Sequence, residues 1–215
     1  MTPPPTTASD AARSAGLLLS AGPRAEVDTW VGASVVPVTV VPLEGWTAVV
    51  TRGGSQAGPP YEDGGLVSAC RALPARAAPG LGFFEVDGRA LVTLHQPGRR
   101  RRVRWVVWEP ERGLLRPPGL DLAGPAEIVA LAGAAPTVRD ELVDLLHETR
   151  VRPARMLQAV MATLGLPGTR LVEDPAHADT VPGAVRRQPD PQQVGWFQDA
   201  VQDSVRLRRE LGVLS

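Results

Sequence analysis

The sequence predicts an α+β fold, with an antiparallel sheet of about five strands and one inserted helix, followed by a helical C-terminal half. The clearest indication is the segment 81–108, in which three β-prone runs follow one another. Asp87-Gly88 separates the first two runs, and this pair favours a two-residue hairpin because both residues tolerate positive φ. Such a turn places Phe84 opposite Leu91, so both faces of the hairpin are largely apolar and we expect both to be covered.

A second pair of strands is predicted before this segment. Residues 30–41 and 46–51 are β-prone and are separated by a short turn, which favours a hairpin. Pro37 cannot donate a hydrogen bond to a neighbouring strand, so we expect an edge strand or a bulge at that position. The inserted helix is expected over about 65–73. Its predicted apolar face comprises Leu66, Cys70 and Leu73.

Helical spacing of apolar residues dominates the second half of the chain. It predicts a short helix over 125–131, a helical hairpin over 137–164 that is divided before Pro153, and a long last helix over 191–211. Residues 166–189 carry scattered proline, glycine and charged residues and are expected to be irregular.

These elements suggest three regions. Residues 1–22 would form a flexible N-terminal tail and a short helix through Leu19, because the tail is rich in proline. Residues 23–115 would form the mixed sheet region and residues 116–215 the helical region. The sequence leaves open whether the last two regions share one hydrophobic core.

Composition limits the cellular setting and the chemistry. The formal net charge is zero, and all 23 basic residues are arginine, a bias that indicates a high-GC bacterium. The single cysteine excludes an intramolecular disulfide and fits a reducing compartment. No segment approaches the roughly 18 apolar residues that indicate a membrane span. We therefore expect a cytoplasmic protein that does not bind a membrane.

The absence of lysine excludes several classes of active site. Without lysine the chain has no P-loop lysine and no lysine that could form a Schiff base. Gly80-Leu-Gly82 has no third glycine at the spacing of the dinucleotide-binding fingerprint. We therefore expect no cofactor.

The most basic segment is a loop between two strands of 81–108. Arginines in this loop could bind nucleic-acid phosphates while a neighbouring tryptophan stacks on a base, or they could bind an anionic protein. They could equally form a solvated turn that keeps a strand edge soluble. The candidate partner-binding residues here are Arg99, Arg100, Arg101, Arg102, Arg104 and Trp105.

Two further segments are candidate sites. In the last helix Trp196 and Phe197 are adjacent and point about 100° apart, so one can pack on the domain while the other meets a partner. Simple packing of the helix across a broad apolar face explains the same pattern and is the favoured alternative. In the irregular segment, four potential oxygen or nitrogen ligands within seven residues could bind a metal, although solvated loops often have this composition. These candidate metal ligands are Glu173, Asp174, His177 and Asp179.

Three functional hypotheses follow. The first is a non-catalytic protein-interaction or regulatory protein that binds another protein or itself, because recognisable catalytic motifs are scarce. The second is a nucleic-acid binder that uses the arginine loop 99–104. The third is a hydrolase-type enzyme whose groups, including His95 at a strand end and His177, converge only in three dimensions.

Overall fold

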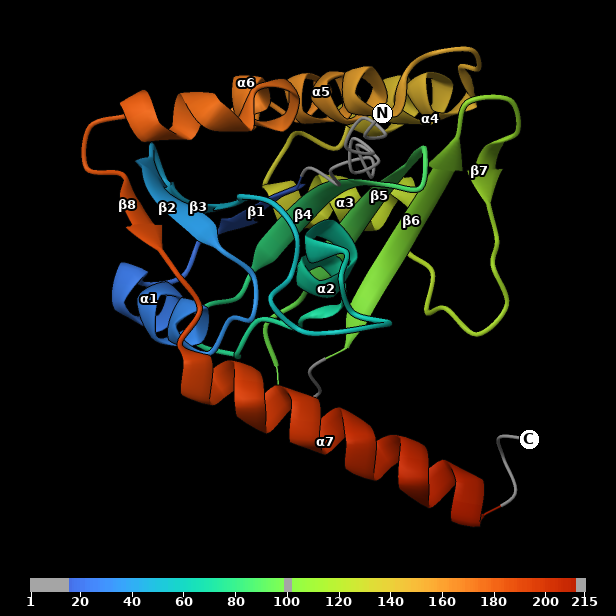
Figure 1. The fold of residues 1–215 in the computed structure, drawn as a ribbon. Coiled ribbons are helices and arrows are strands. Elements are labelled where there is room, and N and C mark those ends of the chain that lie inside the picture. Colours follow the sequence, from blue (N-terminus) through green and yellow to red (C-terminus); the bar gives the residue numbers. More distant parts are fainter. Residues whose placement is uncertain (1–15, 99–101, 212–215) are drawn as a thin grey trace, which may run out of the picture.

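An eight-stranded antiparallel sheet forms the centre of the protein, with helices on both of its faces (Figure 1). The computed structural model describes residues 16–98 and 102–211. The α+β class is therefore confirmed, whereas about five strands was an underestimate of the sheet. In the described residues no helix is both long enough and apolar enough to cross a membrane.

The strands are adjacent in the order β7-β6-β5-β4-β1-β3-β2-β8. The four-stranded meander β4–β7 and the hairpin β2–β3 are therefore joined through β1, which lies between β4 and β3. The strands are β1 (Gly16–Ser20), β2 (Val38–Leu43), β3 (Trp46–Thr51), β4 (Gly80–Val86), β5 (Arg89–His95), β6 (Val103–Glu109), β7 (Gly113–Leu115) and β8 (Val185–Arg187).

Helices precede, interrupt and follow the strands. The four helices at 125–132, 138–147, 153–163 and 191–210 lie within two or three residues of the helices predicted for the second half. Two short helices, at 169–173 and 175–180, fall where irregular chain was expected. The helices are α1 (Arg24–Gly32), α2 (Gly64–Cys70), α3 (Pro125–Ala132), α4 (Val138–His147), α5 (Pro153–Thr163), α6 (Thr169–Glu173), the 3-10 helix η1 (Pro175–Thr180) and α7 (Pro191–Glu210).

The central hairpin has the register that the sequence predicts. Phe84 pairs with Leu91, and the turn residues Asp87 and Gly88 have φ of 48° and 69°. Positive φ at both positions matches the right-handed twist of the strands, which is why an Asp-Gly pair specifies this turn.

The N-terminal boundary differs from the prediction. Residues 16–20 form strand β1 instead of the end of a helix, and β1 lies between β4 and β3 with all five residues buried. A short apolar run has no periodicity that separates a buried strand from a buried helix. Pairing on both sides, with strands distant in sequence, decides the conformation.

The segment around Pro37 also differs. Residues 24–32 form α1, and the strand begins only after Pro37, at Val38. β2 is not an edge strand, because β8 pairs with Val38–Val40. Pro42 lies within β2 but beyond the part that β8 covers, so its missing N–H group is tolerated there.

Two hydrophobic cores lie on opposite faces of the sheet. The first packs α3, α4, α5 and α6 against one face, and it includes Leu17, Leu81, Leu142 and Met156, so strands and the C-terminal helices share it. The second lies under α1 and α2, whose shorter helices cover less of the face. Because both faces are covered, the central strands are largely apolar on both sides.

Glycines in the second face leave room for one large side chain. Phe84 is 1% exposed, and a Cβ added at Gly16 or Gly82 would overlap its ring. At Gly82 the added Cβ would also overlap the Thr93 hydroxyl. The absence of side chains at Gly16 and Gly82 therefore allows Phe84 to lie flat across β1 and β4.

We expect Gly82→Ala to reduce the free energy of unfolding by about 1–3 kcal/mol, because the methyl group would displace Phe84 or Thr93 in a packed core. Urea unfolding measures this loss. Gly32→Ala at the end of α1 is the matched control, since its added Cβ meets nothing within 4 Å. It should be neutral or stabilise by up to about 1 kcal/mol. Equal effects of the two substitutions would contradict this account.

Candidate functional site

The last helix, α7, lies apart from the helices that cover the sheet (Figure 1). It begins at Pro191, and the Asp190 side chain accepts a hydrogen bond of 2.8 Å from the Gln192 backbone N–H. Asp190 as the N-cap and Pro191 at the first helical position both favour helix initiation. With 20 residues the helix is about 30 Å long. None of these residues is fully buried.

One side of α7 contacts the rest of the protein. Val194 and Phe197 pack against the second core, and the Phe197 ring meets Tyr61 edge-on with a centroid distance of 5.3 Å. Val201 continues this side as a half-buried residue. The contact is therefore apolar but narrow.

A second apolar stripe on α7 faces solvent. Trp196 is 56% exposed, Leu207 56% and Leu211 68%. At 100° per residue these three side chains lie within about 60° of one another, and about 100° from the contacting side. The sequence-based proposal that Trp196 and Phe197 face different surroundings is consistent with this arrangement.

The C-terminal end of α7 is also basic. Arg206 pairs with Glu210 at 2.9 Å, whereas Arg208 and Arg209 have no ion pair with any of the residues that the structure describes. Cations at a helix C-terminus interact favourably with the helix dipole. They leave positive charge beside Leu207.

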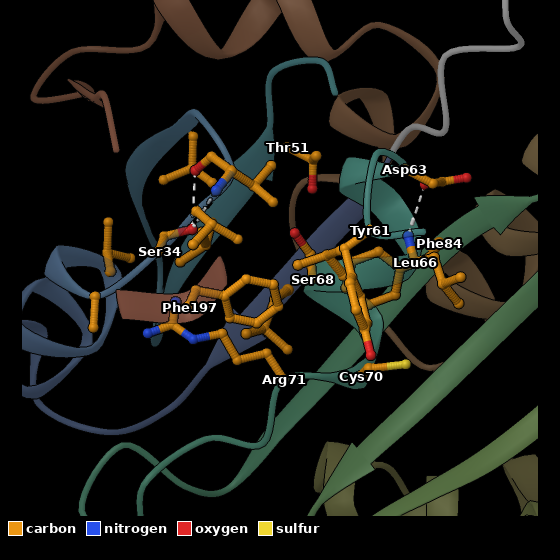
Figure 2. Close-up of a pocket in the computed structure, with 18 of the residues that line it drawn as sticks. Ser34, Thr51, Tyr61, Asp63, Leu66, Ser68, Cys70, Arg71, Phe84 and Phe197 are labelled. Carbon is orange, nitrogen blue, oxygen red and sulfur yellow. Dashed lines mark hydrogen bonds between the residues drawn. The ribbon is translucent and has the colours of Figure 1, made fainter. Parts of the chain in front are cut away.

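A cavity of about 560 Å³ lies beside α7, on the face of the sheet under α1 and α2 (Figure 2). Its walls come from α1 and the segment after it, from strands β1, β2, β3 and β4, from α2 and the segment before it, and from Phe197 of α7. The expected buried face of α2 was wrong: Gly64, Gly65 and Ala69 are buried, whereas Leu66 and Cys70 are exposed and border this cavity.

Part of the arginine loop is held by carboxylates. Arg104 forms ion pairs with Asp121 and Glu127 and donates a hydrogen bond to the Leu122 carbonyl. Arg102 is exposed. The predicted residues Arg99, Arg100 and Arg101 lie outside the described residues.

Trp105, the predicted stacking residue, is half-buried against the second core. Its backbone N–H donates to the Asp121 carbonyl at 2.9 Å, and its carbonyl accepts from Ala123 at 2.8 Å. The segment after β7 therefore runs along β6 beside Arg104 and supplies its acidic partners. Nucleic-acid binding at this loop stays a prediction. Its positive charge is reduced, because Asp121 and Glu127 neutralise Arg104.

Of the candidate metal ligands, Asp179 binds arginine. Arg52 approaches its carboxylate at 2.7 Å and Arg186 at 2.5 Å, and the Thr39 hydroxyl donates to it at 3.3 Å. Hydrogen bonding from Arg186 is the main cause that lowers the pKa of Asp179 to about 2. This cluster ties η1 to β2 and β8.

The other three candidate ligands also have protein partners, and the structure does not gather them around one point. In the described chain no group of three His, Cys, Asp or Glu residues is arranged to hold a metal ion. Metal binding stays a prediction without geometric support. Glu173 contacts Arg155 at 3.1 Å, Asp174 contacts Arg170 at 3.8 Å, and His177 contacts the Thr180 hydroxyl at 2.9 Å.

His95 is the last residue of β5 and is buried beside Leu73 of the second core. It is 3% exposed, and its Nδ1 accepts a hydrogen bond of 3.2 Å from the Leu73 backbone N–H. Nε2 therefore carries the proton and donates to the Thr93 hydroxyl at 3.1 Å. Burial lowers the pKa of His95 to about 4, so the ring is neutral. His177 lies in η1 on the opposite face of the sheet, so the two histidines do not converge.

No protein-family model, curated protein or solved structure matches this chain. Its function must therefore be inferred from α7 and from the adjacent cavity. The cavity residues Trp30, Thr51, Ser68 and Arg71 were not predicted as a site, because they come from three separate segments that only the fold brings together.

We expect the stability of the protein to fall between about pH 6.5 and pH 4 because of His95. The unfolded chain binds this proton below about pH 6.5 and the folded protein only near pH 4, so protonation favours unfolding by up to about 3 kcal/mol. Urea unfolding at pH 7, 6 and 5 measures the loss. His95→Gln should flatten this dependence, whereas His147→Gln, at an exposed position, should keep it. Identical slopes for all three proteins would exclude His95 as the cause.

Proposed function

We propose that this is a non-catalytic protein-interaction protein and that α7 is its docking element. The observation that carries the proposal is the solvent-facing stripe of Trp196, Leu207 and Leu211 on a helix that has no fully buried residue. Contacts along its other side hold the helix in place, so the stripe is available without unfolding the domain.

The stripe has the chemistry of a helix that binds in a groove. Amphipathic helices place apolar residues at helical spacing into an apolar groove of the partner, and tryptophan is enriched among the residues that dominate such interfaces. Covering Trp196 and the two leucines would remove apolar surface from water, which favours association.

Charge restricts the partner surface. Because Arg208 and Arg209 lack acidic partners in the described chain, a groove with carboxylates near its rim would complement the C-terminal end of α7. The partner is another protein or a second copy of this chain, and measuring the solution mass distinguishes the two.

We expect a photo-reactive amino acid at position 196 to form a specific adduct when the protein is irradiated in the cells that make it. The same amino acid at Leu120, which is 39% exposed but lies far along the chain from α7, is the matched control.

Leu207→Asp should weaken association at least tenfold, or about 1.4 kcal/mol, because it places a charge in the apolar stripe. It should change stability by no more than about 0.5 kcal/mol, because the site is exposed.

Light scattering of the purified protein identifies self-association. A dimer that Leu207→Asp converts to a monomer, and that Leu120→Asp leaves intact, supports a second copy as the partner. An adduct of different mass at position 196 supports another protein. No adduct above the level at position 120, together with a monomer, would overturn the proposal.

A further inference from the structure

The cavity beside α7 has the size and the lining of a ligand-binding site. Its volume of about 560 Å³ falls within the range of roughly 300–1,000 Å³ that holds small organic molecules. Apolar side chains dominate its surface. They include Leu18, Val31, Val36, Val38, Val49 and Phe84.

Among the residues that the structure describes, Arg71 is the only cationic one in this lining. One of its terminal N–H groups donates to the Trp30 carbonyl at the end of α1, and the guanidinium stacks on the Trp30 ring with its carbon 4.3 Å from the ring centroid. No carboxylate of the described residues pairs with it. Burial in these apolar surroundings lowers the pKa of Arg71 to about 10.

The Trp30 carbonyl accepts from only one of the N–H donors of Arg71, and stacking on the Trp30 ring uses none of the others. A guanidinium has five N–H donors, arranged so that a carboxylate can accept two of them at once. A half-buried cation in apolar surroundings is costly without an anionic partner, and an anion bound beside it would offset part of that cost. The cavity therefore favours a ligand with a negative group near Arg71.

The remaining polar groups limit the ligand's charge. Asp63, the one acidic residue among the described residues of the lining, accepts a hydrogen bond from the Leu66 backbone N–H at the start of α2, so its carboxylate is already engaged. Because Arg71 supplies a single positive charge, a doubly charged group such as a phosphate monoester would leave excess negative charge beside it in an apolar site. A single carboxylate matches Arg71.

Hydroxyl groups complete the lining: those of Ser34, which donates to the Val36 carbonyl, Tyr61, Thr51 and Ser68. The side chains of Thr51, on β3, and Ser68, on α2, line the cavity, and Figure 2 shows both among its walls. Neither hydroxyl has a hydrogen-bond partner in the part of the chain that the structure describes. Either can bind a hydroxyl or carbonyl oxygen of a ligand, away from its acid group.

We propose that this cavity binds an apolar monocarboxylate, with the carboxylate on Arg71 and the apolar body against Phe84 and the valines of the sheet. This function goes beyond protein docking, and the two are connected through Phe197. That residue lines the cavity and also anchors α7 against Tyr61, so a bound ligand contacts the docking helix.

Calorimetric titration of the wild-type full chain tests the proposal with two matched pairs of ligands. Decanoate is compared with 1-decanol, and 1-naphthylacetate with 2-(1-naphthyl)ethanol, all below their aggregation concentrations. We expect at least one acid to bind with one-to-one stoichiometry and at least tenfold more tightly than its alcohol. Decyl phosphate should bind more weakly than decanoate. Equal affinity within both pairs, or no binding by either acid, would overturn the proposal.

Substitutions then locate the site. Arg71→Gln should remove the preference for the acid while leaving the alcohol's affinity unchanged, and Arg76→Gln, at an 83% exposed side chain, is the matched control. Ser68→Phe should abolish binding of both ligands because it fills the cavity. Leu207→Asp should leave binding unchanged, since it alters only the outward stripe of α7. Loss of binding with Leu207→Asp but not with Ser68→Phe would place the ligand on α7 and overturn the proposal. If Arg71→Gln fails to fold, the comparison of acid with alcohol on the wild-type protein decides alone.

Discussion

The fold depends on the burial of one short strand on every side. β1 hydrogen-bonds to β4 and β3, and each of its five residues is buried. Leu17 and Leu19 face the first core while Leu18 faces the second. Without β1 the sheet would separate into two parts, β4–β7 and β3-β2-β8, each with an exposed apolar edge. Both helical layers pack on a sheet that β1 holds together.

The two faces of the sheet are covered unequally, and the cavity is a consequence. Four helices, α3 to α6, pack on the first face, and a second cavity of about 530 Å³ lies between β6, β7, the start of α3 and the end of α4. On the second face α1 and α2 have only nine and seven residues. Phe84 lies flat over Gly16 and Gly82 and forms part of the cavity's wall instead of filling its space. Incomplete coverage over a flat, apolar surface creates room for a small molecule.

Arginine has different roles in different parts of the protein. Arg52, Arg104 and Arg186 are held by carboxylates, and the pair of Arg52 with Asp179 connects segments that are distant in sequence. Such partly exposed pairs add little stability individually, but they fix the orientation of loops. Arg71 differs, because an aromatic ring and a carbonyl are its only partners in the described chain. This contrast distinguishes Arg71, the proposed ligand-binding arginine, from the arginines that hold the fold together. Amino-acid composition alone cannot make that distinction.

The sequence by itself determined the elements whose information is local. The Asp87-Gly88 turn specified the hairpin register, and proline with helical spacing of apolar residues located α3, α4, α5 and α7 within a few residues. It also placed Trp196 and Phe197 on different sides of one helix, because helix geometry alone requires this.

Only the tertiary structure decided the elements whose conformation depends on distant partners. Gly16–Ser20 is a strand because β3 and β4 bind both of its edges, and Val185–Arg187 is a strand because β2 has a free edge at Val38–Val40. His95 is a buried, neutral histidine because Leu73 and Thr93 surround it. The cavity around Arg71 needs α1, α2, the sheet and α7 at once. No local pattern encodes such a site, because its residues are neighbours only after the chain has folded.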